Sequence, residues 1–114
     1  MINPLKMFAR HHDEEDLRAA VVTALRKVYD PELPVNIYDL GLIYDIDITG
    51  DGRVDIRMTL TAPGCPVAQN FPDEVAAAVK AVPGVSDAHV ELVWEPPWES
   101  TWMSESAKLE LGIF

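Results

Sequence analysis

The sequence predicts a small α+β sandwich with the element order αββαβα, in which a three-stranded mixed sheet carries its helices mainly on one face. Three observations predict this fold class. Stretches with helical spacing of apolar residues alternate with stretches of period two. A Gly-Asp-Gly turn joins the first two strand patterns, and the third strand pattern comes only after a second helical stretch. The chain has 114 residues, of which 48% are hydrophobic, and this is enough for one domain with a core.

The first helix is expected to begin at Asp13, which can cap it. Apolar residues at helical spacing then form one face; they are Leu17, Val21, Leu25, Val28 and Tyr29. Pro31 is expected to end the helix, because the residue before a proline is driven out of the helical region. Residues 1–12 show no clear period and are interpreted as a flexible N-terminal arm, and residues 13–114 as a single domain.

The next two stretches alternate and predict a hairpin. Partners across the strands must point to the same face, which requires a three-residue loop at residues 50–52. The pairs that follow are Ile46 with Ile56, Tyr44 with Met58, Asp45 with Arg57 and Leu42 with Leu60. This register brings the segments NIYDLG and TAPGCP to the same end of the sheet, so Asp39 and Cys65 are expected to be neighbours.

Helical spacing returns after the single cysteine. Pro66 suits the first position of a helix, and Pro72 is a second start signal at which a kink or a restart is expected. The buried face is formed by Phe71, Val75, Val79 and Val82. A third strand follows in VSDAHVELVW, and a short last helix is expected between Ser104 and Gly112.

The composition excludes several classes of protein. A net charge of −10 and a pI of about 4.5 make nucleic acid and membrane surfaces poor partners, because both are anionic. A lone cysteine forms no internal disulfide, which fits a reducing compartment. The N-terminal stretch lacks the apolar segment of a signal peptide, and no apolar run reaches the roughly 18 residues of a membrane span. We therefore expect a cytoplasmic protein.

Cys65 is the main candidate for a reactive group. At the start of a helix, free N–H groups and the helix dipole favour the thiolate, which is both a nucleophile and a ligand for soft metals. A lone cysteine is also commonly a small buried hydrophobic residue, and both interpretations stay open. No CxxC, HExxH or Cys/His cluster indicates a complete metal site.

Five further residues are candidates to support the thiol: Thr59, Thr61, Asp30, Glu32 and Asp39. The two threonines share the polar face of the second strand and lead toward Cys65, where they either bond a ligand or act as ordinary strand residues. The acidic pair in DPELP supplies ligands or holds a turn, and the turn is favoured. Asp39 either faces the thiol or caps the loop that follows it. The three tryptophans of WEPPWESTWM close the core or form a partner surface, and core closure is favoured.

Three stretches together resemble the SufT-like family of iron–sulfur cluster assembly domains; they are YDPELPVNIYDLGLIYDI, MTLTAPGCPVA and VELVWEPPWESTWMSESAKLELG. That family is related to eukaryotic cytosolic iron–sulfur targeting factors and to a phenylacetate ring-oxygenation accessory subunit. The resemblance runs from about Asp13 to Gly112 and implies a compact α/β domain. It also implies that the family's reactive cysteine and its supporting residues fall on Cys65, Asp30, Glu32, Asp39, Thr59 and Thr61.

The resemblance implies an accessory factor in iron–sulfur cluster assembly or transfer that binds rather than turns over a substrate. A cluster usually needs four ligands, so Cys65 alone holds none stably. The cofactor is then a transient cluster or one that bridges a homodimer through two Cys65 thiolates. The expected partners are the assembly machinery and apo client proteins. Two alternatives are a protein-docking scaffold in metalloenzyme maturation, and a thiol enzyme with Cys65 as nucleophile and Asp39 orienting it.

Overall fold

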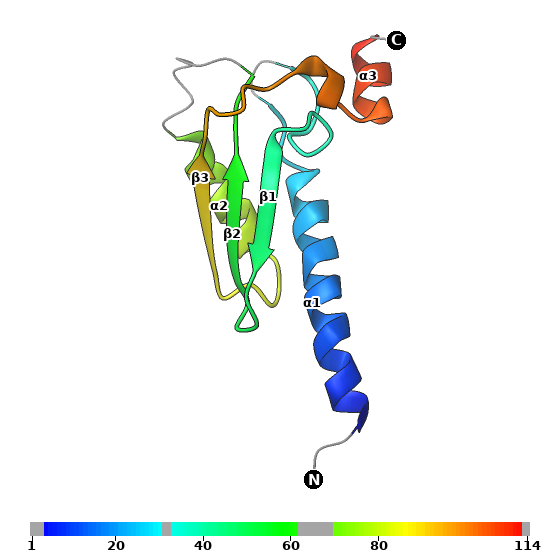
Figure 1. The fold of residues 1–114 in the computed structure, drawn as a ribbon, viewed down its shortest axis with the longest axis vertical. Coiled ribbons are helices and arrows are strands. Elements are labelled where there is room, and N and C mark those ends of the chain that lie inside the picture. The colour runs from blue at the N-terminus through cyan, green and yellow to red at the C-terminus, as the bar shows by residue number, and fades with distance from the viewer. Residues whose placement is uncertain (1–3, 31–32, 62–69, 113–114) are drawn as a thin grey trace.

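The computed structural model describes residues 4–30, 33–61 and 70–112 (Figure 1). The helices are α1 Pro4–Leu25, α2 Phe71–Lys80, the 3-10 helix η2 Ser100–Trp102 and α3 Glu105–Leu111. The strands are β1 Ile43–Ile48, β2 Arg53–Met58 and β3 Asp87–Leu92, in the spatial order β1-β2-β3. β2 pairs antiparallel with β1 and parallel with β3, so the predicted α+β fold with a mixed sheet is confirmed. No helix in these ranges is both long enough and apolar enough to span a membrane.

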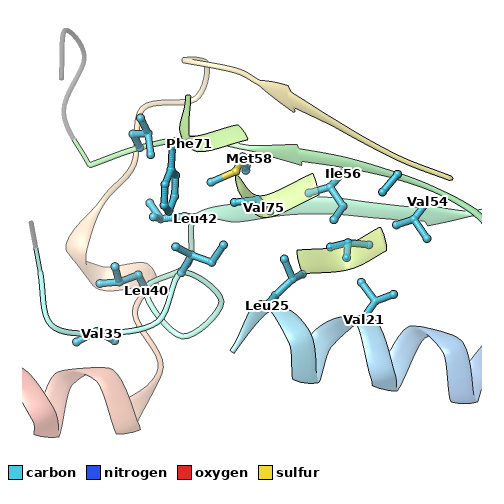
Figure 2. Close-up of a cluster of buried hydrophobic side chains, with 14 of the residues drawn as sticks. Val21, Leu25, Val35, Leu40, Leu42, Val54, Ile56, Met58, Phe71 and Val75 are labelled. Carbon is cyan, nitrogen blue, oxygen red and sulfur yellow. The ribbon is translucent and has the colours of Figure 1, made fainter. Parts of the chain in front are cut away.

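The core lies between one face of the sheet and the two longer helices. Figure 2 shows Val21 and Leu25 of α1 projecting toward Val54 and Ile56 of β2, and all four side chains are buried. From α2 the buried residues are Phe71, Val75 and Val79. The predicted placement of the helices mainly on one face is therefore confirmed. α3 packs at the end of the sheet through the buried Ala107, and Ser104 and Gly112 cap it as predicted.

The extent of α1 differs from the prediction at both ends. The helix begins at Pro4 rather than Asp13, so the expected arm is helical from residue 4 onward. The segment that follows holds leucine, lysine, methionine, alanine and arginine, which favour helix, and a proline is tolerated in the first turn. The helix ends at Leu25 instead of continuing to Pro31, because the N–H of Lys27 bonds the carbonyl of Ala24 in a tighter turn.

Most of the predicted hairpin register is confirmed. Asp45 pairs with Arg57 and Ile46 with Ile56, and the three-residue loop is closed by the bond from Thr49 N to the Arg53 carbonyl. The predicted pair of Tyr44 with Met58 is wrong, because Met58 faces Ile43 and a bulge lies between Ile43 and Asp45.

The side chain of Tyr44 explains why the strand has a bulge at this position. A regular strand would turn the Tyr44 side chain into the core, where its hydroxyl would need a buried partner. An extra residue in one strand re-aims a side chain. In the structure the Tyr44 hydroxyl donates to the Pro96 carbonyl at 2.7 Å, and its ring meets Trp102 edge-on. The bulge also shifts the partner of Leu42 by one residue. Leu42 was predicted to pair with Leu60, but its carbonyl accepts from the N–H of Thr59 at 2.9 Å.

The described part of α2 starts later than Pro66. Its N-cap is Asn70, and Pro72 lies in the first turn. Proline has no N–H to donate to a preceding turn, so Pro72 is suited to the start of a helix and not to its interior. The second of the two predicted start signals is therefore the one at which this helix begins. The expected position of Cys65 at a helix N-terminus lies outside the described residues.

Gly52 in the hairpin loop has a positive φ of 89°, and a Cβ built there would lie 2.4 Å from the Gly84 carbonyl oxygen. We expect Gly52→Ala to lower the free energy of unfolding by about 2–4 kcal/mol, since a left-handed alanine is strained and the contact is with backbone. Gly112→Ala is the matched control, because Gly112 has φ of 72° but no atom within 4 Å. Urea unfolding should show a clearly smaller loss for the control, and equal losses would contradict this account.

Candidate functional site

The candidate site lies at the end of the sheet where β2 and β3 finish and β1 begins (Figure 1). Three segments meet there: the loop of residues 36–42, residues 59–61 directly after β2, and the C-terminal segment of residues 93–104. The bond from Thr59 N to the Leu42 carbonyl joins the first two. The NIYDLG loop therefore reaches the end of the strand that leads to the cysteine. Its expected meeting with TAPGCP involves residues 62–66, which lie outside the described residues. Cys65 itself, four positions after Thr61, lies outside the described residues.

Asp39 is fixed within its own loop. Its carboxylate accepts from Asn36 Nδ2 at 2.8 Å, and the Asn36 side-chain oxygen accepts from the Asp39 N–H at 2.9 Å. Arg26 Nε lies 3.8 Å from the same carboxylate, and the guanidinium lies over the Tyr38 ring. These contacts match the interpretation in which Asp39 caps its loop. A role of Asp39 toward Cys65 stays a prediction.

Asp30 forms the turn that the sequence favours. Its Oδ2 accepts from the N–H of Leu33 at 2.8 Å, and the residue is buried. The Asp30 N–H in turn donates to the Val35 carbonyl, and the neighbouring residues Tyr29 and Asn36 form an isolated bridge. The turn thus holds the start of the loop that carries Asp39. Glu32 lies outside the described residues.

Thr59 is the unusual member of the predicted set. The residue is fully buried, and its Oγ1 has no hydrogen-bond partner among the described residues. A buried polar group without a partner costs about 1–3 kcal/mol, so such a group calls for an explanation. Thr61, two positions on, is half-buried. The structure therefore leaves one hydroxyl of the predicted pair without a partner, on the strand that runs toward Cys65.

The Tyr44 hydroxyl lies near the Thr59 hydroxyl, which influences its protonation. Burial raises the pKa of the Tyr44 hydroxyl above its ordinary value of 10.0, the Thr59 hydroxyl lowers that pKa by a smaller amount, and the Glu99 carboxylate raises it. The two hydroxyls are thus close, although they do not form a hydrogen bond of ordinary geometry. Tyr44 donates to the Pro96 carbonyl instead.

The C-terminal segment clamps the site loop. Trp98 Nε1 donates to the Leu40 carbonyl at 2.7 Å, and the Ser104 N–H donates to the Asp39 carbonyl at 2.8 Å. Gly41 lies so close to this segment that a Cβ there would be 2.7 Å from the Trp102 carbonyl oxygen. Trp98 packs against the core, as favoured for the tryptophans, whereas Trp102 stays 40% exposed.

An open hollow of about 660 Å³ lies beside this clamp. Its walls include Gly41, Tyr44, Arg57, Glu95 and Trp102. Sequence reasoning missed the roles of Gly41 and Tyr44 here. Gly41 could have been recognised from the sequence, because a glycine between two leucines has no side chain to pack and so indicates a close approach of backbone. The role of Tyr44 could not, because this residue fits the alternating strand pattern.

The described residues do not form a metal centre. No group of three or more His, Cys, Asp or Glu within them is arranged to hold a metal ion. Asp30 and Asp39 lie in the same loop region, but the contacts given above engage both carboxylates within the fold. A metal-containing group would thus need ligands beyond these residues.

The chain has relatives of known name. Residues 18–92 match the family described as iron–sulfur cluster assembly protein. A Porphyromonas gingivalis protein named Fe-S protein maturation auxiliary factor is 52% identical over 100 residues, which cover 88% of this chain and 91% of that protein. The Staphylococcus aureus Fe-S protein maturation auxiliary factor SufT is 40% identical over 86 residues, covering 75% of this chain and 98% of that protein. The SufT-like resemblance is thereby confirmed.

Two further similarities concern a larger protein and a fold. The Mycobacterium bovis iron-sulfur cluster carrier protein is 46% identical over 77 residues, covering 68% of this chain but only 20% of the carrier. The crystal structure of a domain of unknown function from Bacillus anthracis matches with a TM-score of 0.80 and 39% identity, covering 88% of this chain and 95% of that one. The same fold thus occurs alone and as part of a longer chain.

The Tyr44 environment predicts late titration. Because its folded pKa is raised, the stability that Tyr44 contributes is present below pH 10 and is lost as the pH rises through the folded pKa. In an alkaline titration followed by tyrosinate absorbance, we expect one component above the ordinary tyrosine range. Tyr44→Phe should remove this component, whereas Tyr29→Phe, at an exposed position, should leave it. Loss of the late component in Tyr29→Phe would contradict the assignment.

Proposed function

The chain belongs to the iron–sulfur cluster assembly protein family, and on that premise we propose that it is an auxiliary factor that helps iron–sulfur clusters reach client proteins. Its relatives of similar length carry the name of maturation auxiliary factors. None of the relatives described above is named as an enzyme, which supports binding and transfer rather than turnover.

The observation that carries the proposal is the buried Thr59 hydroxyl, which has no hydrogen-bond partner among the described residues. A protein that only had to fold would gain stability from a valine of the same shape at this position. Retaining a buried hydroxyl that bonds none of the described residues is reasonable if this hydroxyl bonds a ligand during function. Thr59 precedes Cys65 in the run TLTAPGC, so the hydroxyl and the thiol belong to one short segment.

Cys65 would be the group that touches the cluster. The cluster is the cargo of this protein, and transfer is an exchange of thiolate ligands at iron. A client thiol loses its proton and forms a new sulfur–iron bond, while the bond from Cys65 Sγ to the same iron breaks and the Cys65 thiolate takes up a proton. The exchange moves no electrons, so it needs no oxidant or reductant.

The number of ligands limits how the cargo is held. A cluster commonly has four protein ligands, and the described residues form no group of three or more His, Cys, Asp or Glu arranged for a metal. We therefore propose transient contact, with the other ligands supplied by the donor, by the client or by a second copy of this chain. The cluster carrier that contains a similar segment as a fifth of its length supports cluster transfer as the setting in which this domain acts.

Thr59→Val separates a functional hydroxyl from a structural one. We expect the free energy of unfolding to stay unchanged or to rise by about 1 kcal/mol, since a desolvated hydroxyl is removed. Cluster transfer to an apo-ferredoxin should become slower in the same variant. Thr23→Val is the matched control, because the Thr23 hydroxyl bonds only the Ala19 carbonyl in an exposed helical turn. Unimpaired transfer by Thr59→Val would remove the observation on which the proposal depends.

Cys65→Ser tests the thiol directly. The wild type and the variant are incubated anaerobically with iron and sulfide, and visible absorption, mass and transfer to apo-ferredoxin are measured together. We expect the wild type to speed transfer and Cys65→Ser not to do so. A chromophore with a two-chain mass, both lost in the variant, would mean that a cluster is shared in a dimer. Full activity of the variant would favour the docking scaffold instead.

A further inference from the structure

The two edges of the sheet, β1 and β3, differ in how well they are protected against pairing with another strand. At the β1 edge, Arg18 of α1 donates from Nη1 to the Ile46 carbonyl at 3.0 Å, and the bulge at Tyr44 interrupts the strand. Figure 1 shows α1 running along this side of the sheet. Bulges and covering elements are the usual means by which a protein prevents another strand from pairing with an edge. The β1 edge is therefore protected.

The β3 edge has free backbone groups. The N–H of Val93, directly after β3, bonds the Met58 carbonyl of β2, and the direction of the N–H groups alternates along a strand. The N–H and C=O groups of Val90 and Leu92 consequently point away from β2. Among the described residues no hydrogen bond is made by these two N–H groups, whereas the N–H of Ala88 donates to the carboxylate of its neighbour Asp87.

The side chains along this edge have a regular pattern. On the helix side, Val90 and Leu92 are only half-buried, and Trp94 at the next even position is 39% exposed. On the open side, Asp87 and Glu91 are exposed, and His89 lies between them. A strand added here would cover apolar side chains on one face and meet carboxylates on the other.

We propose that the β3 edge binds an extended segment of a partner protein as a fourth strand. The partner segment has apolar residues on one face and basic residues on the other, so that Val90 and Leu92 are covered while lysines or arginines meet Asp87 and Glu91. Main-chain hydrogen bonds supply affinity in this mode of recognition, and alternate side chains supply specificity. The inference does not depend on the proposed role in cluster transfer, because it uses neither Thr59 nor Cys65.

Charge favours a basic partner over a second copy of this chain. Each chain carries a net charge of −10, so two copies repel one another over distances up to the Debye length. The ion pairs of Asp87 with Lys80 and of Glu91 with Arg57 are long and exposed, at 3.6 and 3.9 Å, and therefore give way at little cost to a partner's basic groups. A basic segment is attracted by the negative charge of this chain and also forms main-chain hydrogen bonds with β3.

The test uses three synthetic peptides with the isotope-labelled wild-type protein. One alternates valine and lysine, one has the same composition without alternation, and one alternates valine and glutamate. We expect only the first to bind and to protect the amide protons of Val90 and Leu92 from exchange. Equal binding of the first two, or binding of the first without this protection, would overturn the proposal.

Val90→Pro removes one outward N–H and leaves the bonds to β2, which use the odd-numbered residues of β3. We expect the Val–Lys peptide to bind at least about fivefold more weakly, the loss of one hydrogen bond. Val90→Thr keeps the N–H and the branched shape, and should bind like the wild type. Equal affinities of Val90→Pro and Val90→Thr would overturn the proposal.

A second variant covers the case in which Val90→Pro does not fold. The double change Asp87→Lys and Glu91→Lys keeps the backbone and should reverse the preference, so that the Val–Glu peptide binds and the Val–Lys peptide does not. An unchanged preference would contradict the charge argument. A wild-type mass that doubles with concentration and falls back when Val90 is changed would show that a second copy occupies the edge, and this result would also overturn the proposal.

Discussion

The candidate site depends on one extra residue in β1. The bulge between Ile43 and Asp45 turns Tyr44 out of the core and shifts the end of the ladder, so that the Leu42 carbonyl meets the Thr59 N–H. Tyr44 can then bond the Pro96 carbonyl, which draws the C-terminal segment over the end of the sheet. Without the bulge the tyrosine hydroxyl would enter the core, and the C-terminal segment would lose this anchor on the sheet.

Among the buried side-chain polar atoms of the described residues, only the Thr59 hydroxyl lacks a hydrogen-bond partner. Asp39 is held by Asn36 and Arg26, and the turn at Asp30 holds the chain that leads to it. These bonds make the loop rigid without using a ligand, so the loop is shaped before any cargo arrives. Against that background the Thr59 hydroxyl is notable, because preorganised sites leave unpaired the groups that a ligand will pair.

Sequence patterns predicted what depends on local periodicity and missed what depends on distant contacts. The alternation around residues 50–52 predicted the loop and the pairs Asp45–Arg57 and Ile46–Ile56, because side-chain parity alone decides them. It could not predict the bulge, since Tyr44 fits an alternating strand pattern. Its contacts with Pro96 and Trp102, which are distant in the sequence, favour the bulged position instead. The candidate residues Asp30, Asp39 and Thr59 were chosen from the sequence, which favoured the local turn at Asp30. The contact of Arg26 with Asp39 and the burial of the Thr59 hydroxyl depend on packing between segments, which the pattern does not encode.

The clamp on the site loop lies beyond residues 18–92, the segment that matches the family. The family match ends at Leu92, the last residue of β3, whereas Trp98 and Ser104 bond the loop from further on. A fragment cut after β3 would hold the whole segment that matches the family and still leave the carbonyls of Asp39 and Leu40 without these donors. The segment by which the family is recognised is therefore shorter than the segment needed to hold the site loop in place.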